Sequence, residues 1–370
     1  MRKLLIALLL LLFLSTPVYA AEERTPIDWY TAAVGADEIE TAVPDGARDL
    51  LEGTNLNVGT SFDGALRQML QNLLAEFGGV FQQAARSAAT VMVIALLAGL
   101  LGSLYEGSGE GAPNYIPLVG VLAVAGVAIG SSGAFIGLGI NTLRELEVFS
   151  KSLFPALAAA STAGGALTSA AVKYAGTVFF FDILITLASR VILPLIYAFI
   201  AASIGNAALG GDGLKGAANL IKWVTGVLIT ALMISFVGYL TITGVVSGSA
   251  DVVTTRVAKT TISMALPVVG GIVADAAETV LAGAMLVRNG IGVMGLLVIL
   301  AVCLVPLLQL GAHYLMFKAA AGLSSAVTDK RTGGLINDLG TAFGMILGLV
   351  GAGAMMLFFS IISMMRMVIR

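Results

Sequence analysis

The residues of this chain best suited to chemistry are a few charged and helix-breaking side chains inside long apolar stretches. In one such stretch, Pro267, Gly270 and Gly271 can open the helical backbone. Asp275 and Glu278 follow three positions apart, on one helical face. A broken or re-entrant helix is tolerated at membrane depth only where protein buries it or where it lines a cavity. We therefore predict that this segment lines a pore or a subunit interface; the alternative is a surface hairpin with solvated carboxylates.

A second pair of ionisable residues, Asp182 and Arg190, lies in another apolar stretch. The two are eight positions apart, so they share a helix face at a separation of roughly 12 Å and cannot pair directly on a straight helix. Each then requires another partner, water, or a position where Arg190 can extend to the membrane interface. Two interpretations remain open for this pair, a structural role and a role in transport.

The sequence contains none of the motifs typical of soluble enzymes. It has no phosphate-binding Walker loop, no zinc-binding His-Glu-x-x-His and no cysteine or histidine cluster, so neither a metal nor a cofactor is expected. Its one cysteine, Cys303, and its one histidine, His313, share an apolar stretch, where packing is the expected role and a proton relay at His313 is the alternative. Basic patches with interleaved aromatic residues are missing, so nucleic-acid binding has no support.

The elements that position these residues are predicted to be membrane-spanning helices. The chain is 58% hydrophobic and only 11% charged, and its mean hydropathy is +0.97, whereas about 25% of a soluble domain is charged. We predict an all-α polytopic membrane protein with six to eight spans, including a re-entrant or broken segment. The predicted apolar stretches are residues 88–105, 115–140, 153–172, 174–209, 220–246, 260–287, 290–317 and 338–364. The pair Gly164 and Gly165 is expected to break the third stretch, and the fourth is long enough to require a kink or a pair of helices.

A secretory signal peptide is predicted over residues 1–20. Arg2 and Lys3 supply the positive start, residues 4–14 the apolar core, and Ala20 the small residue before the cleavage site. The alternative is an uncleaved anchor, but an apolar core of about 11 residues is short against the roughly 20 that span a bilayer. Cleavage would place the following residues on the translocated side of the membrane.

Residues 21–87 are predicted to form an acidic extracytoplasmic region ahead of the polytopic domain, residues 88–370. Eleven acidic residues against four arginines give this region a net charge of −7, although the whole chain has only −2. A short helix is expected over residues 46–51. Residues 61–81 show apolar side chains at helical spacing, which predicts an amphipathic helix that requires a partner surface. That surface could be the membrane, the protein's own spans or another chain.

One stretch of the sequence also resembles a known protein family. The similarity is strongest over residues 246–309 and rests on these runs: GSAD at 248–251, TRVAK at 255–259, PVVG at 267–270, DAAETV at 275–280 and GIGVMG at 290–295. These runs, together with the order of signal peptide, acidic helical region and multiple spans, resemble the stage III sporulation protein AE family of endospore-forming bacteria. The spans of this chain use more alanine and glycine than is typical of that family.

The resemblance implies a role more than a site, because the family has no catalytic motif to carry over. It implies a non-enzymatic membrane subunit of the channel, or feeding tube, that joins mother cell and forespore and is needed for late forespore gene expression. The implied location is the outer forespore membrane. The implied partners are a cytosolic ATPase and ring-forming subunits of the same complex, in a homo-oligomer or hetero-oligomer.

Two other functions stay open on the sequence. A secondary transporter is suggested by the interrupted apolar stretches and their ionisable residues, although no convincing internal repeat surrounds the two glycine pairs. A pure scaffold, whose spans only anchor an assembly, is the third hypothesis. The transported species, if any, and the stoichiometry are not encoded in any motif.

Overall fold

The computed structural model describes residues 39, 41–52, 62–106, 115–209, 213–265, 270–324 and 328–366. Within these residues, side chains are described except at 102–117, 128, 131–132 and 245–280. Every regular element in this part of the chain is a helix, which confirms the predicted all-α fold class. The predicted signal peptide lies outside the described residues.

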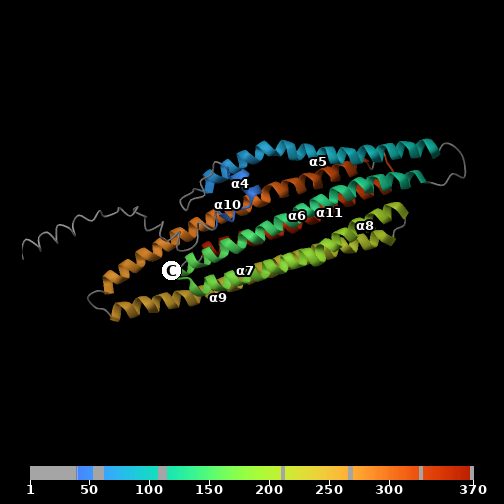
Figure 1. Cartoon of the computed structure of the whole chain (residues 1–370). Helices are drawn as coiled ribbons and strands as arrows, with labels where there is room; N and C mark the ends of the chain where they lie inside the picture. Colours follow the sequence, from blue (N-terminus) through green and yellow to red (C-terminus); the bar gives the residue numbers. More distant parts are fainter. Residues whose placement is uncertain are drawn as a thin grey trace, which may run out of the picture.

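The helices lie side by side in one elongated bundle (Figure 1). They are α4 (Asp45–Leu51), α5 (Phe62–Glu106), α6 (Tyr115–Ala163), α7 (Leu167–Leu187), the π-helical turn η1 (Ala188–Ile192), α8 (Leu193–Leu209), α9 (Gly213–Ala265), α10 (Gly270–Ser324) and α11 (Lys330–Met365). The chain passes along the bundle through α5, α6, α7 with α8, α9, α10 and α11 in turn. Helix α10 contacts α4, α5, α6, α9 and α11, so it occupies a central position.

Five of these passes contain helices that are long and apolar enough to cross a membrane. They are Phe62–Leu101, Leu167–Leu209, Gly213–Gly244, Leu281–Ser324 and Lys330–Met365; α6 adds the shorter apolar segment Leu118–Val127. These segments make the chain a multi-pass membrane protein. The core is filled by large side chains from several passes, among which Phe149, Phe154, Phe199, Phe236 and Phe317 are fully buried.

The predicted break at Gly164 and Gly165 is confirmed as the turn between α6 and α7. Gly165 has a φ of 85°, in the left-handed region that favours glycine. The amide of Gly165 donates to the carbonyl of Thr162, and the amide of Ala166 donates to that of Ser161. This pair of hydrogen bonds is the Schellman arrangement, in which a glycine ends a helix by reversing the backbone.

The long fourth stretch forms one continuous pass with a π-helical turn in its middle, at η1. The amide of Leu193 donates to the carbonyl of Ala188, five residues earlier, as in a π-helix. Pro194 follows directly and has no amide hydrogen, so the carbonyl of Arg190 cannot receive the usual α-helical hydrogen bond. The wider turn is the irregularity that the proline in this stretch predicted.

The predicted amphipathic helix is the first part of α5, continuous with the first membrane pass. Its apolar face is divided between two environments. Ala65, Met69 and Leu73 are buried in the core shared with α4, and Asn72 Nδ2 donates to the Leu50 carbonyl at 3.1 Å. Four other apolar residues remain exposed at helical spacing: Leu70, Leu74, Phe77 and Phe81. We call these four the α5 stripe.

Candidate functional site

The predicted pore segment falls at the connection between α9 and α10. Helix α9 continues to Ala265 and α10 begins at Gly270, so the two form a helical hairpin at one extreme end of the bundle (Figure 1). Gly270, Gly271, Asp275 and Glu278 all belong to the first turns of α10, and their side chains lie outside the described residues, as does Pro267 entirely. The pore or interface role of these residues therefore stays a prediction.

The structure does not bring Asp182 and Arg190 together. Both side chains are exposed, Asp182 on α7 and Arg190 in η1. The carboxylate of Asp182 is close enough to Lys151 of α6 for their charges to interact, while Lys151 itself forms a 2.7 Å ion pair with Glu147. Asp182 thus belongs to a surface group of charges shared with α6.

His313 and Cys303 are packed into α10 as buried residues. His313 Nδ1 lies 2.8 Å from the carbonyl of Gln309, and its ring centroid lies 4.0 Å from that of Phe135 and 5.6 Å from that of Phe343. Its Nε2 atom has no hydrogen-bond partner in the described part of the chain. A carbonyl acceptor at Nδ1 and aromatic rings around it suit a neutral packing histidine better than a relay.

A polar site that the sequence analysis did not single out lies between α9, α10 and α11. At its centre, Lys318 Nζ of α10 donates to three neutral acceptors of α11: the Asn337 carbonyl at 3.1 Å, Asn337 Oδ1 at 2.8 Å and Thr341 Oγ1 at 2.8 Å. Nζ also lies 5.9 Å from the centre of the Tyr314 ring. These contacts position the ammonium group without neutralising its charge.

A second cation, Lys222 of α9, lines the same space. The charges of Lys222, Lys318 and Asp338 are close enough to interact with one another. Among the described residues, ion pairs within 4.0 Å occur only at Asp45 with Arg48 and Glu147 with Lys151, so neither lysine of this site forms a salt bridge. In the part of this site that the structure describes, two cations against one carboxylate leave a local excess of positive charge.

The space between these helices is a groove of about 420 Å³ that we call the lysine groove. Its lining is Lys222, Thr225, Gly226, Ile229, Thr230, Tyr314, Lys318, Thr341, Gly344, Met345, Leu347 and Gly348. Gly344 makes room here, because a Cβ atom at this position would lie only 3.0 Å from the Tyr314 ring. All three helices contribute polar or charged side chains to the groove, and the remaining lining residues are apolar or glycine.

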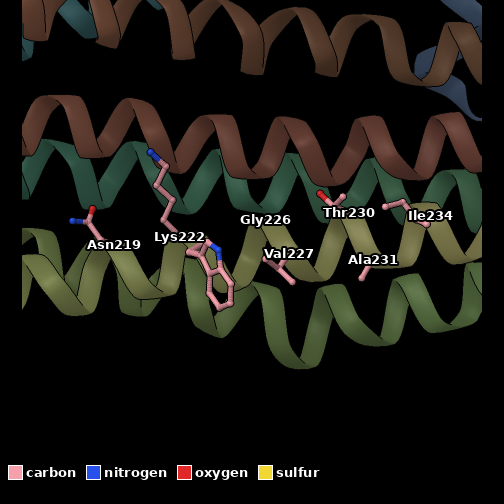
Figure 2. A pocket seen from close by; sticks show the side chains of 8 residues that line it. Asn219, Lys222, Gly226, Val227, Thr230, Ala231 and Ile234 are labelled. Carbon is pink, nitrogen blue, oxygen red and sulfur yellow. The ribbon is translucent and has the colours of Figure 1, made fainter.

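The lysine groove continues into a second hollow along α9, of about 640 Å³ (Figure 2). The two share Lys222, Gly226 and Thr230. In Figure 2, Lys222 extends from α9 toward the ribbon of α11, while Val227 and Ala231 point to the other side of the helix. Gly226 has no atom within 4 Å of the position that a Cβ would occupy, so the hollow is open at this point.

The groove also retains unused hydrogen-bonding capacity. Thr225 has no exposed surface, yet its Oγ1 atom has no hydrogen-bond partner in the described structure. Outside the lining of the groove, Asn206 Oδ1 on α8 is another buried oxygen without a partner in the described structure. An unpaired buried polar group costs about 1–3 kcal/mol, and such groups are usually satisfied by water, ions or ligands.

A third lysine, Lys173 of α7, occupies a closed polar site toward the opposite end of the bundle. It is only 5% exposed, and its Nζ donates to the Ser363 carbonyl of α11 at 2.7 Å. One helical turn further, the hydroxyls of Thr177 and Ser360 lie 2.6 Å apart. The ring of Tyr239 packs directly against Gly176, and its hydroxyl donates to the Val172 carbonyl at 2.7 Å.

These lysines were missed because each resembled an ordinary residue of a span boundary. Lys222 lies near the start of one predicted stretch and Lys318 directly after the end of another. The sequence did contain a signal for the groove: two predicted stretches each have a lysine within two helical turns of one end, and such lysines can meet when the stretches pack together. Among the described residues, no group of three or more histidine, cysteine, aspartate or glutamate side chains could hold a metal ion.

Comparisons with known proteins agree on one family. The family model described as "Stage III sporulation protein AE" matches residues 51–367. The chain is also similar to the stage III sporulation protein AE of Bacillus subtilis (strain 168), with 23% identity over 197 residues. That alignment covers 53% of this chain and 49% of the relative, so the chain spans about half the length of the curated relative it matches. No solved structure matches.

Proposed function

The chain belongs to the stage III sporulation protein AE family, and from this premise we propose that it is a non-enzymatic membrane subunit of the sporulation channel complex. In this role it would lie in the outer forespore membrane and help to join mother cell and forespore. It would be required for late forespore gene expression. The family match carries the sporulation role, and the multi-pass helical bundle supports a role within a membrane.

The length of the helices supports contacts beyond the membrane. Helices α5, α6, α9 and α10 contain 45, 49, 53 and 55 residues. At 1.5 Å per residue, these helices are about 68 to 82 Å long, more than twice the roughly 30 Å of bilayer hydrocarbon. A large part of the bundle must therefore lie outside the lipid, where other subunits can reach it.

The predicted signal peptide gives this bundle an orientation. It places the beginning of α5 on the translocated side, and the passes then alternate. The end of the bundle where α8 joins α9 and α10 joins α11 would face the mother-cell cytoplasm. This end, which we call the lysine end, carries Lys215, Lys222, Lys318, Lys330 and Arg331. The basic residues of the chain divide almost evenly between the two faces, so the proposed orientation rests on the signal peptide and not on this charge.

A conduit would require more than one chain. The interior shared by α6, α8, α9 and α10 is filled by large buried aromatic side chains such as Phe154, Phe199 and Phe236. Close packing of this kind leaves a single bundle without an axial path along the described core. We propose that any conduit is formed between copies of this chain or between this chain and other subunits, including ring-forming proteins and a cytosolic ATPase.

The α5 stripe is the surface that best fits a partner on the translocated side. Leu74 is 70% exposed and Phe77 is 43% exposed, and both precede the uncharged part of α5 that begins after Arg86. Apolar residues recurring at helical spacing outside the hydrocarbon are typical of helix-in-groove contacts. We expect this stripe to dock on another subunit of the complex.

The proposed function is tested by deleting the gene in its native spore-forming host and following a late forespore-specific transcription reporter. We expect the reporter to fail while mother-cell expression continues, and the wild-type gene to restore it. Complementation with Leu74→Glu should fail at normal protein level, whereas Gln71→Glu, at an exposed polar position of α5, should restore the reporter. A normal reporter in the deletion strain would overturn the proposal.

The orientation has its own test. Cys303 is 2% exposed, so single cysteines introduced elsewhere can be labelled selectively. A membrane-impermeant maleimide should label Leu74→Cys in intact spheroplasts and should label Lys215→Cys only after permeabilisation. The reverse pattern would invert the topology without affecting the family assignment.

The transporter alternative obtains no specific support from the described residues. Asp182 and Arg190 are exposed and separate, and the turn at Gly165 connects two passes instead of interrupting one. Solute uptake driven by an ion gradient into liposomes that contain this chain alone would favour that alternative. A pure scaffold would be indicated if neutral substitutions of Asp275 and Glu278 left reporter expression normal.

A further inference from the structure

We propose that the lysine groove binds an anionic membrane phospholipid, with the phosphate at Lys222 and Lys318 and an acyl chain along the apolar face of α9. This site is independent of the sporulation role. It rests on the position of the groove in the bundle, on its charge and on its shape.

The groove lies at the depth expected for lipid headgroups. Lys222 is nine residues from the start of α9 and Lys318 six residues from the end of α10, or about 14 Å and 9 Å along the helices. Trp223 is 64% exposed beside Lys222, and Tyr197 of α8 is 51% exposed twelve residues, or about 18 Å, from the end of its helix. Exposed tryptophan and tyrosine side chains are enriched where the hydrocarbon meets water.

The charge of the groove favours an anion. Among the described residues, Lys222 and Lys318 have one carboxylate, Asp338, as their neighbour of opposite charge, and Lys318 donates only to neutral oxygens. A phosphate oxygen could accept from both ammonium groups, because lysine is a flexible cationic donor. The unpaired hydroxyl of Thr225 lies in the lining of the same groove and offers a further donor.

The apolar part of the groove identifies the source of that phosphate as a lipid. From Lys222 the open surface continues along α9 past Gly226 and Thr230 to Ile234, within the candidate membrane span Gly213–Gly244. A soluble phosphate would leave this surface unused, whereas an acyl chain would cover it. Basic pockets between transmembrane helices on the cytoplasmic side are typical sites for anionic headgroups.

The test measures lipid retained by the purified full-length chain. Native mass spectrometry in detergent with equal phosphatidylglycerol and phosphatidylcholine should show a preference for phosphatidylglycerol. The double variant Lys222→Met with Lys318→Met should lose this preference, by about fivefold for each lysine. The matched control, Lys215→Met with Lys330→Met, removes two exposed positive charges from the same end of the bundle and should keep it.

A third variant addresses the acyl chain and does not alter the charge. Gly226→Leu fills the open hollow, where no atom lies within 4 Å of a Cβ, and should reduce binding of phosphatidylglycerol while both lysines remain. Circular dichroism and gel filtration would show whether each variant is folded. If the double lysine variant does not fold, Gly226→Leu still tests the proposal. Equal losses in the control double variant, or unchanged binding in folded groove variants, would overturn the proposal. Displacement of the lipid signal by inorganic phosphate alone would show a soluble-anion site and would also overturn it.

Discussion

Lys173 and Lys318 donate to main-chain carbonyl groups of α11 near its two opposite ends, yet their surroundings differ. Lys173 is buried and reaches the Ser363 carbonyl, with the Thr177 and Ser360 hydroxyls paired close by. Lys318 is half-buried, lies beside the second cation Lys222, and borders an open groove. One region is closed and its polar groups contact protein; the other is open and has hydrogen-bonding capacity to spare.

The difference separates two uses of a lysine within an apolar bundle. A buried ammonium group that reaches a helix-terminal carbonyl joins two helices and is costly to remove, because its acceptor then remains in an apolar environment. An ammonium group at a groove can exchange its contacts for water or a ligand at little cost. We therefore expect substitutions in the closed region to affect stability and those in the lysine groove to affect binding.

The largest contrast is expected from one substitution made at a glycine of each region. Gly176→Leu should lower the free energy of unfolding by about 3 kcal/mol, because its side chain would displace the Tyr239 ring packed against it. Gly226→Leu should not lower the free energy of unfolding, since nothing lies within 4 Å of the position of its Cβ and leucine has a higher helix propensity than glycine. Unfolding by sodium dodecyl sulfate in mixed micelles measures both.

The parent protein serves as the reference for this pair, and Gly176→Ala as a graded intermediate. Alanine adds only the Cβ, so Gly176→Ala should lower the free energy of unfolding by less than Gly176→Leu does. Equal stability of the two leucine variants would mean that the closed region is not packed as described. A strong loss at Gly226 would mean that the hollow on α9 is filled by protein.

Substitution of Lys173 should also destabilise the protein more than substitution of Lys318, but the difference in the free energy of unfolding should be smaller than for the two glycines. Lys173→Met should cost about 1–3 kcal/mol, because the Ser363 carbonyl loses a donor that solvent cannot easily replace. Lys318→Met should cost less, since Asn337 and Thr341 border an open groove that water can enter. The same unfolding titration compares them, and a larger loss at Lys318 would contradict the division into closed and open regions.

Much of the fold followed from local patterns in the sequence. Apolar stretches predicted the helices, Gly164 and Gly165 predicted the turn between α6 and α7, and Pro194 marked the irregular pass. Each of these depends on a few neighbouring residues, so the physical cause is visible in the sequence itself. The buried half of the amphipathic face on α5 was predictable for the same reason, although its partner, α4 with α10, was not.

The lysine groove could not be predicted in this way, because its lining residues come from three successive helices and are far apart in the sequence. Lys222 and Lys318 are 96 positions apart in sequence and become neighbours only when α9 and α10 pack on α11. Nor does sequence distinguish the buried Lys173 from the groove lysines, since all three lie in or beside apolar stretches. Burial and the nature of the acceptors, both tertiary properties, decide which lysine is available to a ligand.

The smallest expected effect concerns a single hydroxyl group of the closed region. Tyr239→Phe removes the hydrogen bond to the Val172 carbonyl, which joins α9 to α7, and should cost about 1 kcal/mol. Tyr197→Phe makes the same chemical change at a side chain that is 51% exposed and should cost close to nothing. A difference between the two in the same unfolding titration would show that the closed region is held by its individual hydrogen bonds. If both variants matched the parent, the stability of this region would come from the packing of Tyr239 on Gly176, and Gly176→Leu would then be its more sensitive probe.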